Sequence, residues 1–307
     1  MASIHDLPSE TILRILSFIH TPSSLKTPTD LARFKKDETL FDNYNESVRS
    51  LQRASCVSKL WLTLAQPMLW CHLNVWTYIG ARLINECPAL GRFTTDELNV
   101  LVGEDDEWTV KGWRNNFLSL VTRLKGLKKL GLAGIRPINA EWVQEENLKD
   151  LTHLNVNVFM FQITLAPPAI FQLSSLEIGS YVHDASFIES IFKSSSKTLT
   201  SLKFKPAYPK TPTTLLNAFS LIQNSLQHFE LVGKLQDVEA VLPNLKSLTS
   251  VRFTFRMYQE DFFGFLSTAL GALPACTTSV TLSLRQPFEH LGINIKGVVE
   301  RLRDGWD

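Results

Sequence analysis

The chain has 307 residues, of which 44% are hydrophobic and 20% are charged, a composition that can bury a sizeable core and excludes a disordered protein. Its formal net charge of +1 provides no strong field to attract nucleic acid or an anionic membrane, so neither is an expected partner. The four cysteines form no CxxC pair and the seven histidines show no metal-binding spacing, so we expect neither a metal nor an organic cofactor.

The first ten residues, MASIHDLPSE, lack the cationic and apolar regions of a secretory signal peptide. The sequence contains no stretch of about 18 apolar residues, so no membrane-spanning helix is predicted. We therefore expect the chain in the cytoplasm or the nucleus, with its cysteines reduced.

Two helical blocks are predicted near the N-terminus, at residues 4–19 and 48–65. In the first block, Pro8 suits the first helical turn and Glu10 suits the positive end of the helix. Apolar residues recur at helical spacing in both blocks. They are Ile12, Leu13, Ile15, Leu16 and Ile19, and then Leu51, Ala54, Val57, Trp61 and Leu64. Residues 20–47 are poor in apolar side chains and are expected to form an inserted loop, within a helical module that spans residues 1–69.

Both blocks resemble an F-box. Its LP-x-E opening matches Leu7-Pro8-Ser9-Glu10, and its closing block of apolar, small, Val and Trp residues matches Leu51, Ala54-Ser55, Val57 and Trp61. The resemblance implies docking onto the Skp-type adaptor of a cullin–RING ubiquitin ligase. The family positions that face the adaptor, or that bury or flank the contact, correspond to Leu7, Pro8, Ile12, Leu16, Val57 and Trp61. The insertion at 20–47 departs from the compact family pattern, and the alternative role for these apolar residues is the module's own core.

From about residue 70 onward, the pattern Φ-x-x-Φ-x-Φ recurs, where Φ is mostly Leu, Val or Phe. The central Φ residues are Leu73, Leu98, Leu130, Leu154, Leu176, Leu202, Phe229, Val251 and Val280. The Φ-x-Φ part alternates as a strand with one buried face does, and the segments between the strands have helical apolar spacing. A unit of one strand and one helix cannot close a core alone, but stacked copies can.

This pattern resembles the leucine-rich repeat family over roughly residues 70–290. The resemblance implies an α/β fold in which residues 70–307 form an irregular right-handed β/α solenoid. The Asn or Cys that usually follows LxxLxL in that family is missing here, which fits the uneven repeat lengths. The alternative architecture is a closed β/α barrel, which suits an enzyme. The residues that follow the strands, such as Ala133, Asn157, Gly179 and Lys205, offer no coherent catalytic set.

Polar residues that alternate with the Φ positions should face the concave side of a solenoid and contact a target protein. Those selected as target-binding are His153, Asn155, Glu177, Lys203, Lys205, His228, Glu230, Arg252, Arg256 and Arg285. Lys203 and Arg252 should flank Glu230 on neighbouring strands, and the basic excess in the later repeats predicts an acidic or phosphorylated target. The alternative for any one of them is an ordinary solvated surface.

The sequence therefore predicts a non-enzymatic substrate-receptor subunit of a ubiquitin ligase. Its F-box would dock on the adaptor, and its repeats would bind a target protein. A scaffold whose N-terminal module only caps the repeats is the second hypothesis. An enzyme on a closed barrel is the third.

Overall fold

The computed structural model describes residues 7–19, 48–75, 78–102, 110–134, 140–157, 167–179, 185–205, 217–233, 238–255 and 262–284. The predicted insertion at 20–47 and the predicted site residues Arg256 and Arg285 lie outside these ranges. Within the described ranges, no helix is long and apolar enough to cross a membrane.

The N-terminal module consists of α1 (Ser9–Ile19), a helix at residues 48–55 and α4 (Lys59–Cys71). Ser58 caps α4, because its hydroxyl oxygen accepts a hydrogen bond from the backbone N–H of Trp61 at 3.3 Å. These helices share a small core of their own. It contains Ile12, Leu16, Leu51, Ala54, Trp61 and Ala65.

Nine strands follow within these described ranges, and α4 runs directly into the first of them. They are β1 (His72–Val75), β2 (Glu97–Val102), β3 (Lys129–Gly134), β4 (His153–Asn157), β5 (Ser175–Ile178), β6 (Ser201–Phe204), β7 (His228–Val232), β8 (Ser250–Phe255) and β9 (Ser279–Leu284). The strands form one all-parallel sheet in the order of the sequence. Within the described chain this sheet is open, with β1 and β9 at its two edges.

The register confirms the predicted repeat. Each central Φ residue is the cross-strand partner of the next one, so that Leu98 pairs with Leu130 and Leu130 pairs with Leu154. The same alignment continues to Val251 and Val280. Because the strand period is two, this register turns every Φ-x-Φ pair toward the same face of the sheet.

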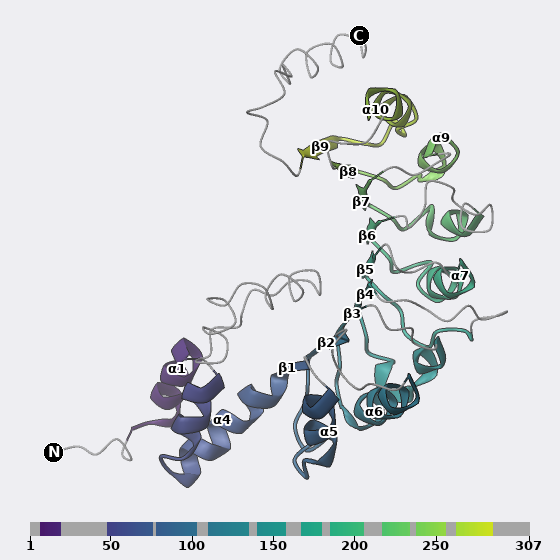
Figure 1. The fold of residues 1–307 in the computed structure, drawn as a ribbon. Coiled ribbons are helices and arrows are strands. Elements are labelled where there is room, and N and C mark those ends of the chain that lie inside the picture. Colours follow the sequence, from purple (N-terminus) through teal and green to yellow (C-terminus); the bar gives the residue numbers. More distant parts are fainter. Residues whose placement is uncertain are drawn as a thin grey trace.

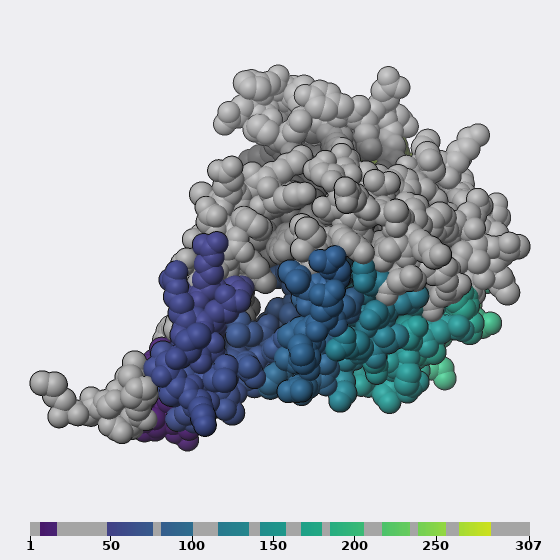
Figure 2. All heavy atoms as spheres, turned by 60° about the horizontal axis from the view of Figure 1, so that its bottom comes forward, coloured from purple at the N-terminus to yellow at the C-terminus, as the bar shows by residue number. Residues whose placement is uncertain are grey.

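Helices cover that face. They are α5 (Tyr78–Glu86), α6 (Val110–Arg123), α7 (Ala185–Ser194), α9 (Val238–Val241) and α10 (Phe262–Gly271), with short 3₁₀ segments η2 (Ala140–Gln144), η3 (Glu146–Leu148), η4 (Ser220–Ile222) and η5 (Leu242–Asn244). In Figure 1 the strands line the inner side of an arc and the helices lie on its outer side. Figure 2 shows the N-terminal module at one end and the first repeats following it in chain order.

One continuous hydrophobic core fills the space between the strands and the helices. Aromatic rings link its layers: Trp142 lies 6.0 Å from Phe117 and 6.3 Å from Phe171, measured between ring centroids. Phe219 in turn lies 6.0 Å from Phe229 of β7. Since no single repeat encloses these rings, the repeats must stack to bury them.

A ladder of hydroxyl groups runs along the edge where the strands begin, and the sequence analysis did not predict it. The carbonyl of Ser174, for example, accepts the N–H groups of both Thr200 and Ser201 and also the Thr200 hydroxyl. The same arrangement recurs at the carbonyls of Lys128, Thr152, Gln227 and Thr249. The visible signal is a Ser or Thr two residues before the central Φ residue. This ladder holds the strand entrances in register.

Candidate interaction surfaces

The inner face of the sheet carries two rows of polar positions, each made of cross-strand partners. The first row, at the start of the strands, is His72, Glu97, Lys129, His153, Ser175, Ser201, His228, Ser250 and Ser279. The second row, two residues further along, is Asn74, Asn99, Gly131, Asn155, Glu177, Lys203, Glu230, Arg252 and Thr281. Seven predicted target-binding residues therefore lie in these rows, and Lys205 follows directly after β6.

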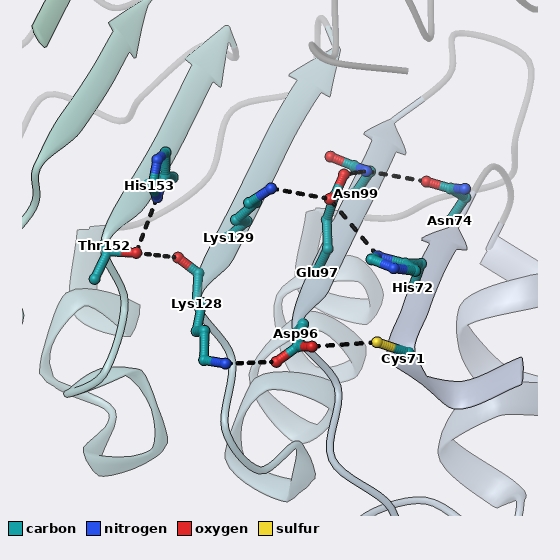
Figure 3. Close-up of polar contacts among 10 residues, drawn as sticks. All are labelled: Cys71, His72, Asn74, Asp96, Glu97, Asn99, Lys128, Lys129, Thr152 and His153. Carbon is teal, nitrogen blue, oxygen red and sulfur yellow. Dashed lines mark hydrogen bonds and ion pairs between the residues drawn. The ribbon is translucent and has the colours of Figure 1, made fainter. Parts of the chain in front are cut away.

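A polar network joins the two rows on the first strands (Figure 3). The Glu97 carboxylate accepts a hydrogen bond from the Asn99 amide at 2.8 Å and lies 3.7 Å from the His72 ring and 4.0 Å from the Lys129 ammonium. Burial acts to raise the pKa of Glu97, but the neighbouring His72 ring and the hydrogen bond from Asn99 outweigh it and lower that pKa. Asn99 also donates to Asn74 at 3.1 Å. Glu97 is thus a charged group whose surroundings already satisfy it.

A second set of contacts lies at the entrances of the same strands. The Cys71 thiol donates to one oxygen of Asp96 at 3.2 Å, and the Lys128 ammonium lies 3.1 Å from the other oxygen (Figure 3). Hydrogen bonds from the Cys71 thiol and then from Lys128 lower the pKa of Asp96. Burial and the neighbouring Asp96 raise the pKa of the Cys71 thiol. A thiol that stays protonated is a poor nucleophile. The contacts of this cluster join the entrances of the first three strands.

His153 occupies the next position of the first row, beside Lys129. Its ring contacts the Thr152 hydroxyl at 2.9 Å. Burial and then the positive charge of Lys129 lower the pKa of His153, so its neutral form is favoured.

In the middle of the second row, Glu177 binds two neighbours. It accepts from the Asn155 amide at 2.7 Å and lies 2.8 Å from the Lys203 ammonium. Lys203 and Arg252 do flank Glu230 in the register, as predicted. The Lys203 ammonium is paired with Glu177, its neighbour on the other side. Glu230 instead accepts a hydrogen bond from the Thr254 hydroxyl at 3.3 Å.

The N-terminal module separates its apolar residues into two groups. Three of the predicted adaptor-binding residues, Ile12, Leu16 and Trp61, are buried in the module's core. Leu7 is half-buried, while Pro8 and Val57 are exposed. Further exposed apolar side chains are Leu13, Leu60 and Leu62. Helical spacing identified the apolar stripe but could not tell its outward side from its inward side.

Within the described chain, no group of three or more His, Cys, Asp or Glu side chains is arranged to hold a metal ion. Comparison with protein-family models and with curated proteins found no match to this sequence.

Proposed function

We propose that this chain is a substrate-receptor subunit of an SCF-type, cullin–RING ubiquitin ligase, and that it performs no chemistry itself. One observation carries the proposal. A helical module with its own core, and with exposed apolar side chains, is joined to an open parallel sheet whose inner face is polar. Exposed apolar side chains on helices suit a partner groove.

The open sheet favours a leucine-rich-repeat-like solenoid over the closed barrel. In a closed barrel β1 and β9 would both have two neighbouring strands, whereas each lies at an edge of the described sheet. An arc of parallel strands offers a long inner surface to a partner. A target on that face would be held close to the ligase machinery, and transfer would be accelerated by effective concentration.

The adaptor contact on this proposal uses the exposed apolar residues of the module. Pro8, Leu13 and Val57 would enter the adaptor's groove, with Leu60 and Leu62 at its margins. Ile12, Leu16 and Trp61 would support that surface from inside, because their burial leaves them no area to offer. Leu7, half-buried, would lie between the two groups.

The test is binding of the full chain to a purified Skp-type adaptor by size-exclusion chromatography and calorimetry. The informative variant is Leu13→Asp with Val57→Asp, since both side chains are exposed and the fold should persist. Leu83→Asp on α5 is the matched control, because Leu83 is an exposed leucine outside the module. Binding by the parent and the control, with loss in the double variant, would support the proposal. A folded parent that does not bind the adaptor would overturn it.

A protein-interaction scaffold is the second candidate, and one contact favours it. Trp70 of α4 packs against the core of the sheet, and α4 continues without a break into β1. The module therefore also covers the first edge of the repeat core. If the adaptor does not bind, this covering role remains and the inner face remains the functional surface.

A further inference from the structure

The polar side chains of the inner face differ in whether they already have partners. From β1 to β6 the charged groups of the two rows are paired: Glu97 with Lys129, and Glu177 with Lys203. A ligand that binds there has to displace or desolvate an existing pair, which offsets much of what it gains.

On β7, β8 and β9, by contrast, several polar side chains of the two rows have no partner within the described chain. Arg252 is exposed and, within the described chain, has neither an ion pair nor a hydrogen bond. Within the described chain, the side chains of His228, Ser250, Ser279 and Thr281 around it likewise have neither an ion pair nor a hydrogen bond. Ser250 is half-buried and the other three are exposed. These five residues, which we name the β7–β9 donor cluster, have unused hydrogen-bond donors on one continuous surface.

The register gives the cluster its dimensions. His228, Ser250 and Ser279 are successive partners in the first row, and Arg252 and Thr281 are partners in the second. Neighbouring strands lie about 4.8 Å apart, and residues two apart on a strand lie about 6.6 Å apart. A single anionic group above Arg252 is therefore within reach of the guanidinium and of the surrounding hydroxyl groups.

Among the described residues, Glu230 is the carboxylate beside the cluster, and it already accepts a hydrogen bond. Glu230 is the second-row partner of Arg252, but it accepts the hydroxyl of the buried Thr254, two residues beyond Arg252 on β8. It thus opposes an anion in the cluster by its charge without occupying the guanidinium.

We propose that the β7–β9 donor cluster binds a phosphorylated residue of the target protein. This inference rests on the proposed function only in taking the inner face as the target-binding surface. Guanidinium forks and hydroxyl groups form strong, charge-assisted hydrogen bonds with phosphate oxygens. A phosphate monoester has three such oxygens and nearly two negative charges, and so uses more of these donors than a carboxylate does.

The probe is a degenerate library of labelled peptides with phosphoserine fixed at the centre, applied to the immobilised full chain at about 0.15 M ionic strength. Parallel libraries carry glutamate or unmodified serine at that position. Retention of the phosphoserine library about tenfold or more above the serine library is expected. The glutamate library should fall between the two. Retention of the glutamate library equal to that of the phosphoserine library would replace the phosphate with a general acidic segment and overturn the proposal.

Four variants locate the site. Arg252→Ala should abolish the phosphoserine preference, and Arg252→Lys should restore only part of it, because an ammonium lacks the fork. Glu230→Gln should strengthen retention by about threefold, since a like charge is removed. Lys203→Met is the matched control and should have an effect below about twofold, because Lys203 is two strands away and paired with Glu177. Equal losses in the Lys203 and Arg252 variants, or no loss in Arg252→Ala, would overturn the assignment.

These measurements are independent of the adaptor. The Leu13→Asp, Val57→Asp variant should keep the phosphoserine preference, and Arg252→Ala should keep adaptor binding. Failure of peptide binding with intact adaptor binding would remove this inference alone. Failure of adaptor binding with intact peptide binding would remove the ligase assignment alone.

Discussion

The ammonium of Lys203 on β6 lies 2.8 Å from the carboxylate of Glu177 on β5. Both side chains are largely sheltered, with 27% and 18% of their surface exposed. The pair is therefore intermediate between a solvated surface ion pair, which contributes little, and a buried pair, which is costly to break.

Lys203→Met should destabilise the chain by about 1 kcal/mol, because it leaves the Glu177 carboxylate with the Asn155 amide as its one partner among the described residues. Combining it with Glu177→Gln should cost less than the sum of the two single changes. Urea denaturation of the four forms measures this coupling. Arg252→Met is the control and should stay within about 0.5 kcal/mol of the parent, since Arg252 is exposed and has no partner among the described residues. Strict additivity of the two changes would contradict the pairing.

Glu97 should make stability depend on pH. Burial acts to raise the pKa of Glu97, but the neighbouring His72 ring and the hydrogen bond from Asn99 hold it below its ordinary value of 4.5. The unfolded chain therefore takes up this proton first. The stabilisation is present above about pH 4.5 and is lost as the pH falls through the lower, folded-state pKa. Glu97→Gln should flatten the decline in the free energy of unfolding below that pH, as followed by urea denaturation at fixed ionic strength.

The matched control for Glu97 is Glu189→Gln. Glu189 lies on the exposed side of α7, and the described chain provides it with no hydrogen bond or ion pair. This change should leave the decline in acid as it is in the parent. An equally steep decline in Glu97→Gln would show that the network at β1–β3 does not link stability to protons.

The sheet could be predicted from the sequence because the two-residue alternation of Φ positions marks every strand. Alternation of Φ residues requires the strands, and the repetition of Leu98, Leu130 and Leu154 requires that they align. Helical spacing of apolar residues between the strands likewise predicted helices there, and the structure has them at 185–194 and 262–271.

The pairing of polar side chains could not be predicted from that period. Spacing places Lys203 in a row between Glu177 and Glu230, but both neighbours are equally distant in the register. In the structure the Lys203 ammonium lies against Glu177, and Glu230 accepts a hydrogen bond from the Thr254 hydroxyl. The N-terminal stripe has the same limitation, because helical spacing alone does not show that Leu16 faces inward and Leu13 outward.

The hydroxyl groups of Ser195 and Thr200 should differ sharply in what they contribute to the free energy of unfolding. The Ser195 side chain is fully buried and accepts the backbone N–H of Leu173 at 2.9 Å. The Thr200 hydroxyl donates to the Ser174 carbonyl, which already accepts two backbone N–H groups. Ser195→Ala should cost about 1–3 kcal/mol, because it leaves a buried N–H without an acceptor. Thr200→Val should cost less than about 1 kcal/mol.

Chemical denaturation of the two variants gives the comparison directly. Hydrogen exchange of the Leu173 amide adds a local measure, which should become faster in Ser195→Ala and stay unchanged in Thr200→Val. The reverse order of the two costs would mean that the hydroxyl ladder, and not the buried Ser195, carries the stability of this region.

The Asn157 side chain leaves no room for a side chain at position 179, which is a glycine. The Gly179 N–H donates to the carbonyl of Val156 at 2.7 Å, which holds the end of β5 against β4. A Cβ at position 179 would lie 2.6 Å from the Cβ of Asn157, and closer still to its Cγ and Oδ1. Gly179→Ala should therefore destabilise the chain by about 1–3 kcal/mol through overpacking.

Second-site changes at Asn157 distinguish this steric cause from a backbone cause. Asn157→Gly removes the entire side chain and should recover most of the loss in the Gly179→Ala background. Asn157→Ala keeps the Cβ that lies too close and should recover less. Thermal unfolding of the three variants decides between the two causes. Equal recovery by glycine and alanine would show that the amide, and not the Cβ contact, excludes a side chain at 179.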